Sequence, residues 1–225
     1  MKNGYKKVAH FSEGKFRTIL KCFALDLTAS HTAELSGLSR NTINKIFLQI
    51  RQRVYLLAHQ KAGDDKSFGT FECDESYFGA KRVRGKRGRG AAGKTPVFGL
   101  LKRDDKVFVK IVDNCSKRQL LPIIQGKVLE GSTINTDGWK AYDGLVVNGY
   151  DHYRVFHSKD EFARGKCHVN GIESFWSFAK RRLAKFNGLT DEKFYLHLKE
   201  CEWRFNHKHD NIYKILLKEF RNNPL

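Results

Sequence analysis

The spacing of apolar residues changes twice along the chain, and these changes limit the folds open to it. Between about residues 11 and 60, apolar side chains recur at helical spacing. The positions in this pattern are Phe16, Ile19, Leu20, Phe23, Ile43, Ile46, Phe47 and Ile50. After the acidic, glycine-containing segment 63–67, short apolar runs typical of strands replace the pattern, and helical spacing returns from Val169 onward. The sequence therefore predicts a helical block, a block containing a sheet, and a helical end.

The middle block predicts the class of the fold. Its candidate strands are residues 70–76, 97–102, 107–112, 133–136 and 153–156, and a helical stretch at 120–129 lies between the third and the fourth. A meander followed by alternating helix and strand indicates an α/β fold with a mixed sheet flanked by helices. We predict an all-α domain over residues 1–65, and a sheet domain with C-terminal helices over residues 66–225.

The charge of the chain favours a polyanionic partner. The 42 Lys and Arg residues outnumber the 24 Asp and Glu residues, which gives a formal net charge of +18. Every apolar run is too short to span a membrane, and the N-terminus lacks the apolar segment of a signal peptide. The five cysteines are widely spaced, which favours neither a zinc-binding pair nor a disulfide framework. We therefore expect a cytoplasmic protein without a membrane partner.

Residues 28–50 have the pattern of a helix-turn-helix. The small Ala33 allows two helices to approach closely, Gly37 suits the positive φ of a tight turn, and Ser39 can cap the second helix. The second helix would present polar side chains to base edges and phosphates in a major groove. These side chains are Arg40, Asn41, Asn44 and Lys45. The alternative is a helical hairpin without a DNA role, which the net charge of the chain disfavours.

Three carboxylates are candidates for a functional site in the predicted sheet block and the helix that follows it. Asp74 lies in a predicted strand, on the face opposite Phe71 and Cys73. Asp137 ends a later strand, and strand ends are where sites form in α/β sheets. Glu173 lies on a predicted helix, off its apolar stripe. That stripe consists of Ile172, Trp176, Ala179 and Leu183.

Carboxylate oxygens are the ligands that Mg²⁺ and Mn²⁺ prefer, and two such ions support displacement at a phosphodiester. A lone Asp or Glu is more often a cap, a turn residue or an ion-pair partner, so only the set of three favours a metal site. Strand alternation also places Glu72 on the face of Asp74, where it can support the site, and points Glu75 away from it.

A basic, glycine-rich segment separates the first two carboxylates. Residues 80–94 contain seven basic side chains, four glycines and no acid, which predicts a loop that binds the phosphate backbone. The phosphate ligands expected in it are Lys81, Arg82, Arg84, Lys86, Arg87 and Arg89. Lys180 lies seven residues after Glu173 on the same helical face, where it can hold a DNA phosphate near the metal ions or be a plain surface lysine.

Several short segments occur together in one order: 74–79, 137–142 and 168–177, followed by 205–207 and 213–217. Over most of residues 69–217 the chain resembles small bacterial insertion-sequence transposases with a DDE catalytic core, of the ISXO-like group. The resemblance implies an RNase H-like fold, with Asp74, Asp137 and Glu173 as the catalytic and metal-binding acids. Some members use an asparagine as the third residue, and Asn170 lies one helical turn before Glu173. We prefer Glu173, because a carboxylate binds Mg²⁺ more strongly than an amide oxygen does.

The resemblance implies a transposase that binds the terminal inverted repeats of its element, hydrolyses a phosphodiester, and joins the freed 3′-hydroxyl to double-stranded target DNA. Two Mg²⁺ or Mn²⁺ ions per active site are expected. Because transposases of this kind bring two DNA ends together, the resemblance also implies a homodimer or a higher oligomer. The alternatives are an RNase H-like nuclease without strand transfer, and a helix-turn-helix regulator that binds DNA without cleaving it.

Overall fold

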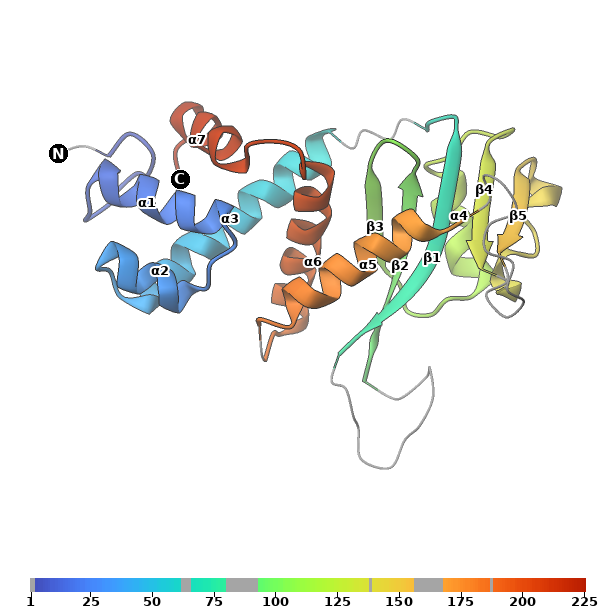
Figure 1. Ribbon diagram of the computed structural model, residues 1–225, viewed down its shortest axis with the longest axis horizontal. Coiled ribbons are helices and arrows are strands. Elements are labelled where there is room, and N and C mark those ends of the chain that lie inside the picture. The colour runs from blue at the N-terminus through green and yellow to red at the C-terminus, as the bar shows by residue number, and fades with distance from the viewer. Residues whose placement is uncertain (1–2, 62–65, 80–92, 138, 156–167, 187) are drawn as a thin grey trace. The chain divides into compact units, whose positions relative to one another are not determined.

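The computed structural model describes residues 3–61, 66–79, 93–137, 139–155, 168–186 and 188–225, and it divides into two compact units (Figure 1). Unit 1 comprises residues 1–61 and 192–225, and unit 2 comprises residues 62–191. Within the described ranges, no helix has the length and apolar character needed to cross a membrane.

Unit 1 is all-helical. It contains α1 (Glu13–Ala24), α2 (Ala29–Ser36), α3 (Arg40–Lys61), α6 (Asp191–Asn206) and α7 (Ile212–Asn222). All eight apolar residues of the predicted helical pattern belong to its buried core, which confirms that pattern. Trp203, Leu216 and Phe220 belong to the same core. These helices therefore pack with C-terminal residues that the sequence places in the 66–225 domain, and the predicted boundary itself stays a prediction.

The turn between α2 and α3 follows the helix-turn-helix pattern. Gly37 ends α2 with a φ of 65°, and the Ser39 hydroxyl accepts a hydrogen bond from the Thr42 backbone N–H at 3.2 Å. Both features were expected from the sequence, because a left-handed turn residue favours glycine and a serine satisfies a free N–H at a helix start. The predicted recognition side chains are all exposed: Arg40, Asn41, Asn44 and Lys45.

A buried ionic cluster ties α6 to the N-terminal helices. Arg204 donates to the carbonyls of Phe23 and Ala24 at the end of α1, and its Nε lies 2.8 Å from a Glu200 oxygen. The other oxygen of Glu200 accepts from Arg51 of α3 at 2.7 Å. Charged groups are rarely buried unless they are paired, so this cluster fixes the relative positions of α1, α3 and α6.

We expect Phe220→Ala to lower the free energy of unfolding of unit 1 by about 3–5 kcal/mol, because the ring is fully buried against Phe16 and its loss leaves a cavity. Denaturant unfolding followed by circular dichroism measures the change. Leu35→Ala is the control, since that side chain is 62% exposed and its loss should change stability by less than about 0.5 kcal/mol. Equal effects of the two substitutions would contradict the packing of α7 described here.

Unit 2 contains a five-stranded mixed sheet in the order β3-β2-β1-β4-β5. The strands are β1 (Thr70–Phe78), β2 (Thr95–Lys102), β3 (Val107–Ile111), β4 (Thr133–Asp137) and β5 (Asp151–Val155). β1, β2 and β3 pair antiparallel, whereas β4 pairs parallel to both β1 and β5. This is the RNase H-like arrangement, and it confirms the fold class and the five predicted strands.

The two faces of the sheet are covered differently. On one face, Phe71 and Cys73 of β1 share a core with Leu120 and Ile124 of α4 (Lys117–Gln125). On the other face, α5 (Asn170–Leu183) crosses β1 and β2 (Figure 1). Two short 3-10 helices, η1 (Lys140–Tyr142) and η2 (Val146–Asn148), connect β4 to β5.

The helix predicted at 120–129 begins and ends earlier than expected. It starts at Lys117, after Ser116, and ends at Gln125. The apolar residues that follow do not extend the helix, because Val128 forms an isolated bridge with Ser67. An apolar residue in such a bridge cannot be distinguished from a helical one by spacing alone.

Candidate active site

Asp74 and Asp137 lie on neighbouring strands of the sheet. The parallel register pairs Glu72 with Asn135 and Cys73 with Thr136, so the next residue of each strand is Asp74 on β1 and Asp137 on β4. Residues paired across a parallel ladder point to the same face. The structure therefore brings the first two predicted acids together, on the face that α5 covers.

The third predicted acid approaches them from the helix. Glu173 is exposed in the first turn of α5, and its negative charge is among the causes that raise the pKa of Asp74. Asn170, the alternative third residue, begins the same helix and is also exposed. Lys180 lies two turns after Glu173 and is exposed to solvent. Asn170, Glu173 and Lys180 thus share one helix, whose start adjoins the strand carboxylates.

The environment of Asp74 disfavours its ionised form. Burial raises its pKa to about 6, and the negative charges of Asp137 and Glu173 act in the same direction. Two neutral donors oppose this shift: the backbone N–H of Glu75, and Trp176 Nε1, which lies 3.1 Å from Asp74 Oδ2. The Asp74 carboxylate therefore has neutral hydrogen-bond donors and lies near other carboxylates, and such a group favours binding of a cation.

The donor set fits a divalent metal ion. Asp74, Asp137 and Glu173 offer hard carboxylate oxygens, which Mg²⁺ and Mn²⁺ prefer. One oxygen of Asp137 accepts from the Trp139 backbone N–H at 3.1 Å, which leaves the other for a ligand. In the part of the chain that the structure describes, no three His, Cys, Asp or Glu side chains are yet close enough to hold a metal. A cation would have to draw these carboxylates together.

Trp176 and Gly99 are site residues that the sequence analysis missed. The periodicity of α5 assigns Trp176 to the apolar stripe, and it is indeed buried, but its indole N–H donates to Asp74. Gly99 pairs with Asp74 across β1 and β2, and a Cβ built on it would lie 2.5 Å from Trp176 Cζ2. The one signal in the sequence was a glycine inside an otherwise apolar strand, which marks a close approach of another group.

Glu72 and Glu75 point to opposite faces of the sheet, as strand alternation predicts. Glu72 is 1% exposed and accepts a hydrogen bond from the Ile172 backbone N–H at the start of α5. Glu75 points to the opposite face, where the Tyr142 hydroxyl donates to it. Burial is the main cause that raises the pKa of the Tyr142 hydroxyl, and the charge of Glu75 adds to it. Only Glu72 therefore adjoins the candidate site.

The remaining predicted ligands of DNA lie elsewhere or outside the described residues. Arg40, Asn41, Asn44 and Lys45 are exposed on α3 in unit 1. The six basic residues Lys81, Arg82, Arg84, Lys86, Arg87 and Arg89 lie outside the described ranges.

Four of the five cysteines, Cys22, Cys73, Cys115 and Cys201, are free and buried, and Cys167 is outside the described residues.

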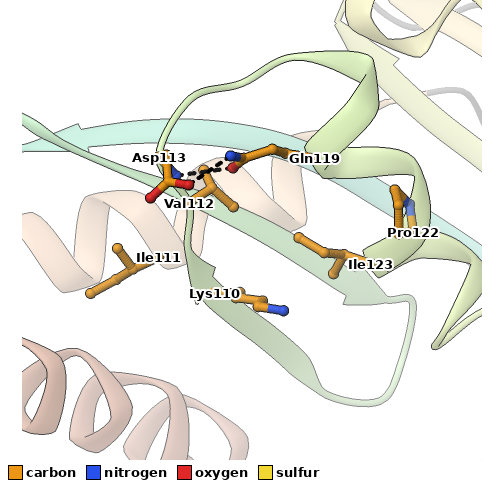
Figure 2. Close-up of a pocket in the computed structure, with 7 residues that line it drawn as sticks. All are labelled: Lys110, Ile111, Val112, Asp113, Gln119, Pro122 and Ile123. Atoms are coloured by element: carbon orange, nitrogen blue, oxygen red, sulfur yellow. Dashed lines mark hydrogen bonds between the residues drawn. The ribbon is translucent and has the colours of Figure 1, made fainter.

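A shallow hollow of about 350 Å³ lies between β3 and α4 (Figure 2). In Figure 2, the Gln119 amide donates to the Asp113 carboxylate at 2.8 Å and closes one end of it. The other lining residues are Lys110, Ile111, Val112, Pro122 and Ile123. None of the predicted site residues lines this hollow.

A family model described as "ISXO2-like transposase domain" matches residues 67–206, which is more than half of the chain. The chain belongs to this family of ISXO2-like transposase domains. Family membership and fold together support a DDE transposase in general, and the matched segment contains Asp74, Asp137 and Glu173.

Two curated relatives of this ISXO2-like domain come from transposable elements or resemble their proteins. A transposase-like protein of Haemophilus influenzae is 45% identical over 114 residues, covering 51% of this chain and 92% of that protein. A protein in transposable element ISH50 of Halobacterium salinarum is 30% identical over 152 residues, covering 60% of this chain. This chain spans about half of the Halobacterium protein, with 52% covered.

Among solved structures, the ISXO2-like chain is similar to the catalytic core domain of BIV integrase, with 13% identity and a TM-score of 0.41. That match covers 68% of this chain and 96% of the integrase domain. It is also similar to the Mos1 transposase in a paired-end complex with the left transposon end, with 11% identity and a TM-score of 0.35. That match covers 96% of this chain and 80% of Mos1.

We expect Gly99→Ala to lower the free energy of unfolding by about 1–3 kcal/mol and to break the bond from Trp176 to Asp74, because the added methyl group overlaps the indole. Thermal unfolding and near-ultraviolet circular dichroism of the tryptophans measure both effects. Gly14→Ala in α1 is the matched control: its added Cβ would be 3.8 Å from its nearest neighbour, so stability should stay equal or rise. A stable Gly99→Ala variant with an unchanged tryptophan spectrum would refute the close approach.

Proposed function

We propose that this protein is the transposase of an insertion sequence, acting in the cytoplasm. It would hydrolyse a phosphodiester at the element's ends and join the freed 3′-hydroxyl to target DNA. The observation that carries the proposal is that the segment matched by the transposase family model contains the strand carboxylates Asp74 and Asp137 side by side, with Glu173 on the helix that covers them. Asp74 and Asp137 adjoin each other across parallel strands, and Glu173 is near enough to raise the pKa of Asp74.

In this proposal Asp74, Asp137 and Glu173 hold two Mg²⁺ or Mn²⁺ ions. When bound, such ions supply Lewis acidity and an activated oxygen nucleophile for in-line displacement at phosphorus. Other residues of the chain hold the carboxylate ligands in position by hydrogen bonds. Trp176 orients one oxygen of Asp74, and the Trp139 backbone N–H orients one oxygen of Asp137. Glu173 is preferred to Asn170 because a carboxylate binds Mg²⁺ more strongly than an amide oxygen does.

Recognition of DNA is assigned to two further surfaces. The exposed polar face of α3 would read the terminal inverted repeats in a major groove, because its side chains stand clear of the unit 1 core. The basic residues of 80–94 and Lys180 would bind phosphates of the element end and of the target. We propose a homodimer or a higher oligomer as the active form, since two DNA ends must be joined.

The experiment is cleavage and joining of labelled double-stranded DNA that carries the flanking element ends, with Mg²⁺ or Mn²⁺ and with EDTA. Asp74→Asn, Asp137→Asn and Glu173→Gln should each reduce joining by about a hundredfold or more, because charge stabilisation by a metal contributes several kcal/mol. Asp105→Asn is the matched control, since this exposed carboxylate lies in the turn between β2 and β3. It should leave joining unchanged.

The same assay separates the rival functions. Metal-dependent cleavage without joined products would favour an RNase H-like nuclease. Binding without cleavage under every metal condition would favour a helix-turn-helix regulator. Full joining by Glu173→Gln together with loss in Asn170→Ala would instead make Asn170 the third ligand.

We expect Asn44→Ala to weaken binding to the terminal repeat by about 1–3 kcal/mol, because it removes a contact that reads base edges. Lys45→Ala should weaken binding to all DNA sequences and reduce the salt dependence of the affinity by about one unit of slope. Fluorescence anisotropy with repeat and scrambled duplexes measures both. Lys214→Ala on α7, an equally exposed lysine, is the control. An Asn44→Ala variant that still prefers the repeat as strongly would exclude α3 as the recognition helix.

A further inference from the structure

Glu72 is a buried carboxylate for which the proposed chemistry has no role. It lies on β1, two residues before Asp74 and on the same face, and only 1% of its surface is exposed. A charged group at such depth is strongly disfavoured unless it is paired and hydrogen-bonded. Its partners therefore indicate what it does.

Those partners belong to one place, the start of α5. Glu72 Oε2 accepts from the Ile172 backbone N–H at 3.0 Å, and Glu72 Oε1 accepts from Arg103 Nε at 3.0 Å. The other arm of Arg103 reaches the same helix start, because its NH2 group donates to the His168 carbonyl at 2.7 Å. The His168 ring also lies beside Glu72, with Nδ1 3.4 Å from Oε1.

The sheet and the helix fit together closely here. Gly171 lies between Glu72 and the axis of α5, and a Cβ built on it would lie 2.9 Å from Glu72 Oε2. A helix start carries partial positive charge on its free N–H groups, so a carboxylate at that point is stabilised. Glu72 thus serves as the capping group of α5, supplied by the sheet, where the helix's own N-cap residue Val169 has no side-chain cap.

We propose that Glu72 is a positioning residue of the active site. By binding the N–H of Ile172, the residue immediately before Glu173, and by orienting Arg103 on His168, it fixes the first turn of α5. The Glu173 carboxylate is then held opposite Asp74. The inference rests on the proposed function, because Glu173 is taken as a metal ligand. Glu72 itself is not a ligand, since both of its oxygens are engaged by the helix and by Arg103.

Stability alone does not account for this arrangement. A buried ion pair adds little net stability, because desolvation of the charges offsets most of their attraction. The bonds to Glu72 and Arg103 instead fix the position and orientation of the first turn of α5. They tie the first turn of α5 to β1, the strand that carries Asp74, so one strand sets the positions of two of the three acids.

The test measures Mn²⁺ binding to the full-length protein by isothermal titration calorimetry, with no DNA and no turnover. Glu72→Gln keeps the size of the side chain and an acceptor for Ile172 but loses the charge that orients Arg103. We expect its Mn²⁺ affinity to fall by about tenfold, as is usual when a group supporting a metal ligand is changed. Hydrogen exchange in residues 169–176 should become faster in the same variant.

Glu200→Gln is the matched control. Glu200 is also 1% exposed and also pairs with two arginines, but it lies in unit 1. This variant should lose comparable stability while keeping the Mn²⁺ affinity and the exchange rate of residues 169–176. If Glu72→Gln does not fold, Arg103→Gln is measured in the same way, since it leaves the Glu72 bond to Ile172 in place and removes the bonds of Arg103 to Glu72 and to the His168 carbonyl.

The outcomes separate this inference from the proposed function. Unchanged Mn²⁺ affinity and unchanged exchange in Glu72→Gln would overturn the positioning role, as would an equal loss of affinity in Glu200→Gln. If the wild-type protein binds no Mn²⁺, the proposed function fails. The positioning role, which rests on that function, then fails with it, and hydrogen exchange in Glu72→Gln reports only whether Glu72 fixes the first turn of α5.

Discussion

The close approach of α5 to the sheet is the constraint on which the candidate site depends. Two positions permit it by lacking a side chain. At Gly99 of β2, the indole of Trp176 from α5 occupies the space where a Cβ would be. At Gly171 of α5, the carboxylate of Glu72 from β1 occupies the corresponding space. Because of this closeness, a helix side chain can donate to Asp74 and a strand side chain can accept from the helix backbone. Larger residues would separate the two layers and undo both bonds.

The central strand divides unit 2 into an apolar side and a charged side. On the α4 side, β1 contributes Phe71 and Cys73 to a core that excludes water. On the α5 side it contributes two carboxylates: burial raises the pKa of Asp74, which accepts a hydrogen bond from Trp176, and Arg103 pairs with Glu72. These charged groups add little to the stability of the fold, because desolvation opposes each favourable contact. The apolar core on the α4 side and the apolar stripe of α5, which includes Ile172 and Trp176, must therefore supply most of the stability that allows such a site to exist.

Much of this arrangement follows from local sequence rules. Alternation along β1 predicts that Glu72 and Asp74 share a face, and helix-turn-helix spacing predicts the left-handed turn at Gly37 and the cap at Ser39, all of which the structure confirms. These features depend on residues within a few positions of one another, so a single chain segment contains the information.

Other features were not predictable, because they depend on distant partners. The role of Glu72 depends on Ile172, which is 100 residues away, and on Arg103, which is 31 residues away. Likewise, the apolar stripe of α7 shows that one face is buried, but not that Phe220 packs with Phe16 of α1. Periodicity identifies a buried face and cannot identify what covers it.

The alternation of β1 also restricts how a chain of this kind can change in length. A strand has a period of two, so inserting or deleting one residue within Thr70–Phe78 would exchange its two faces. The carboxylates would then enter the apolar core, and Phe71 and Cys73 would face α5. Substitutions can alter this strand one side chain at a time, whereas a change in length leaves the pairing of Asp74 with its neighbours intact only in the connections between strands.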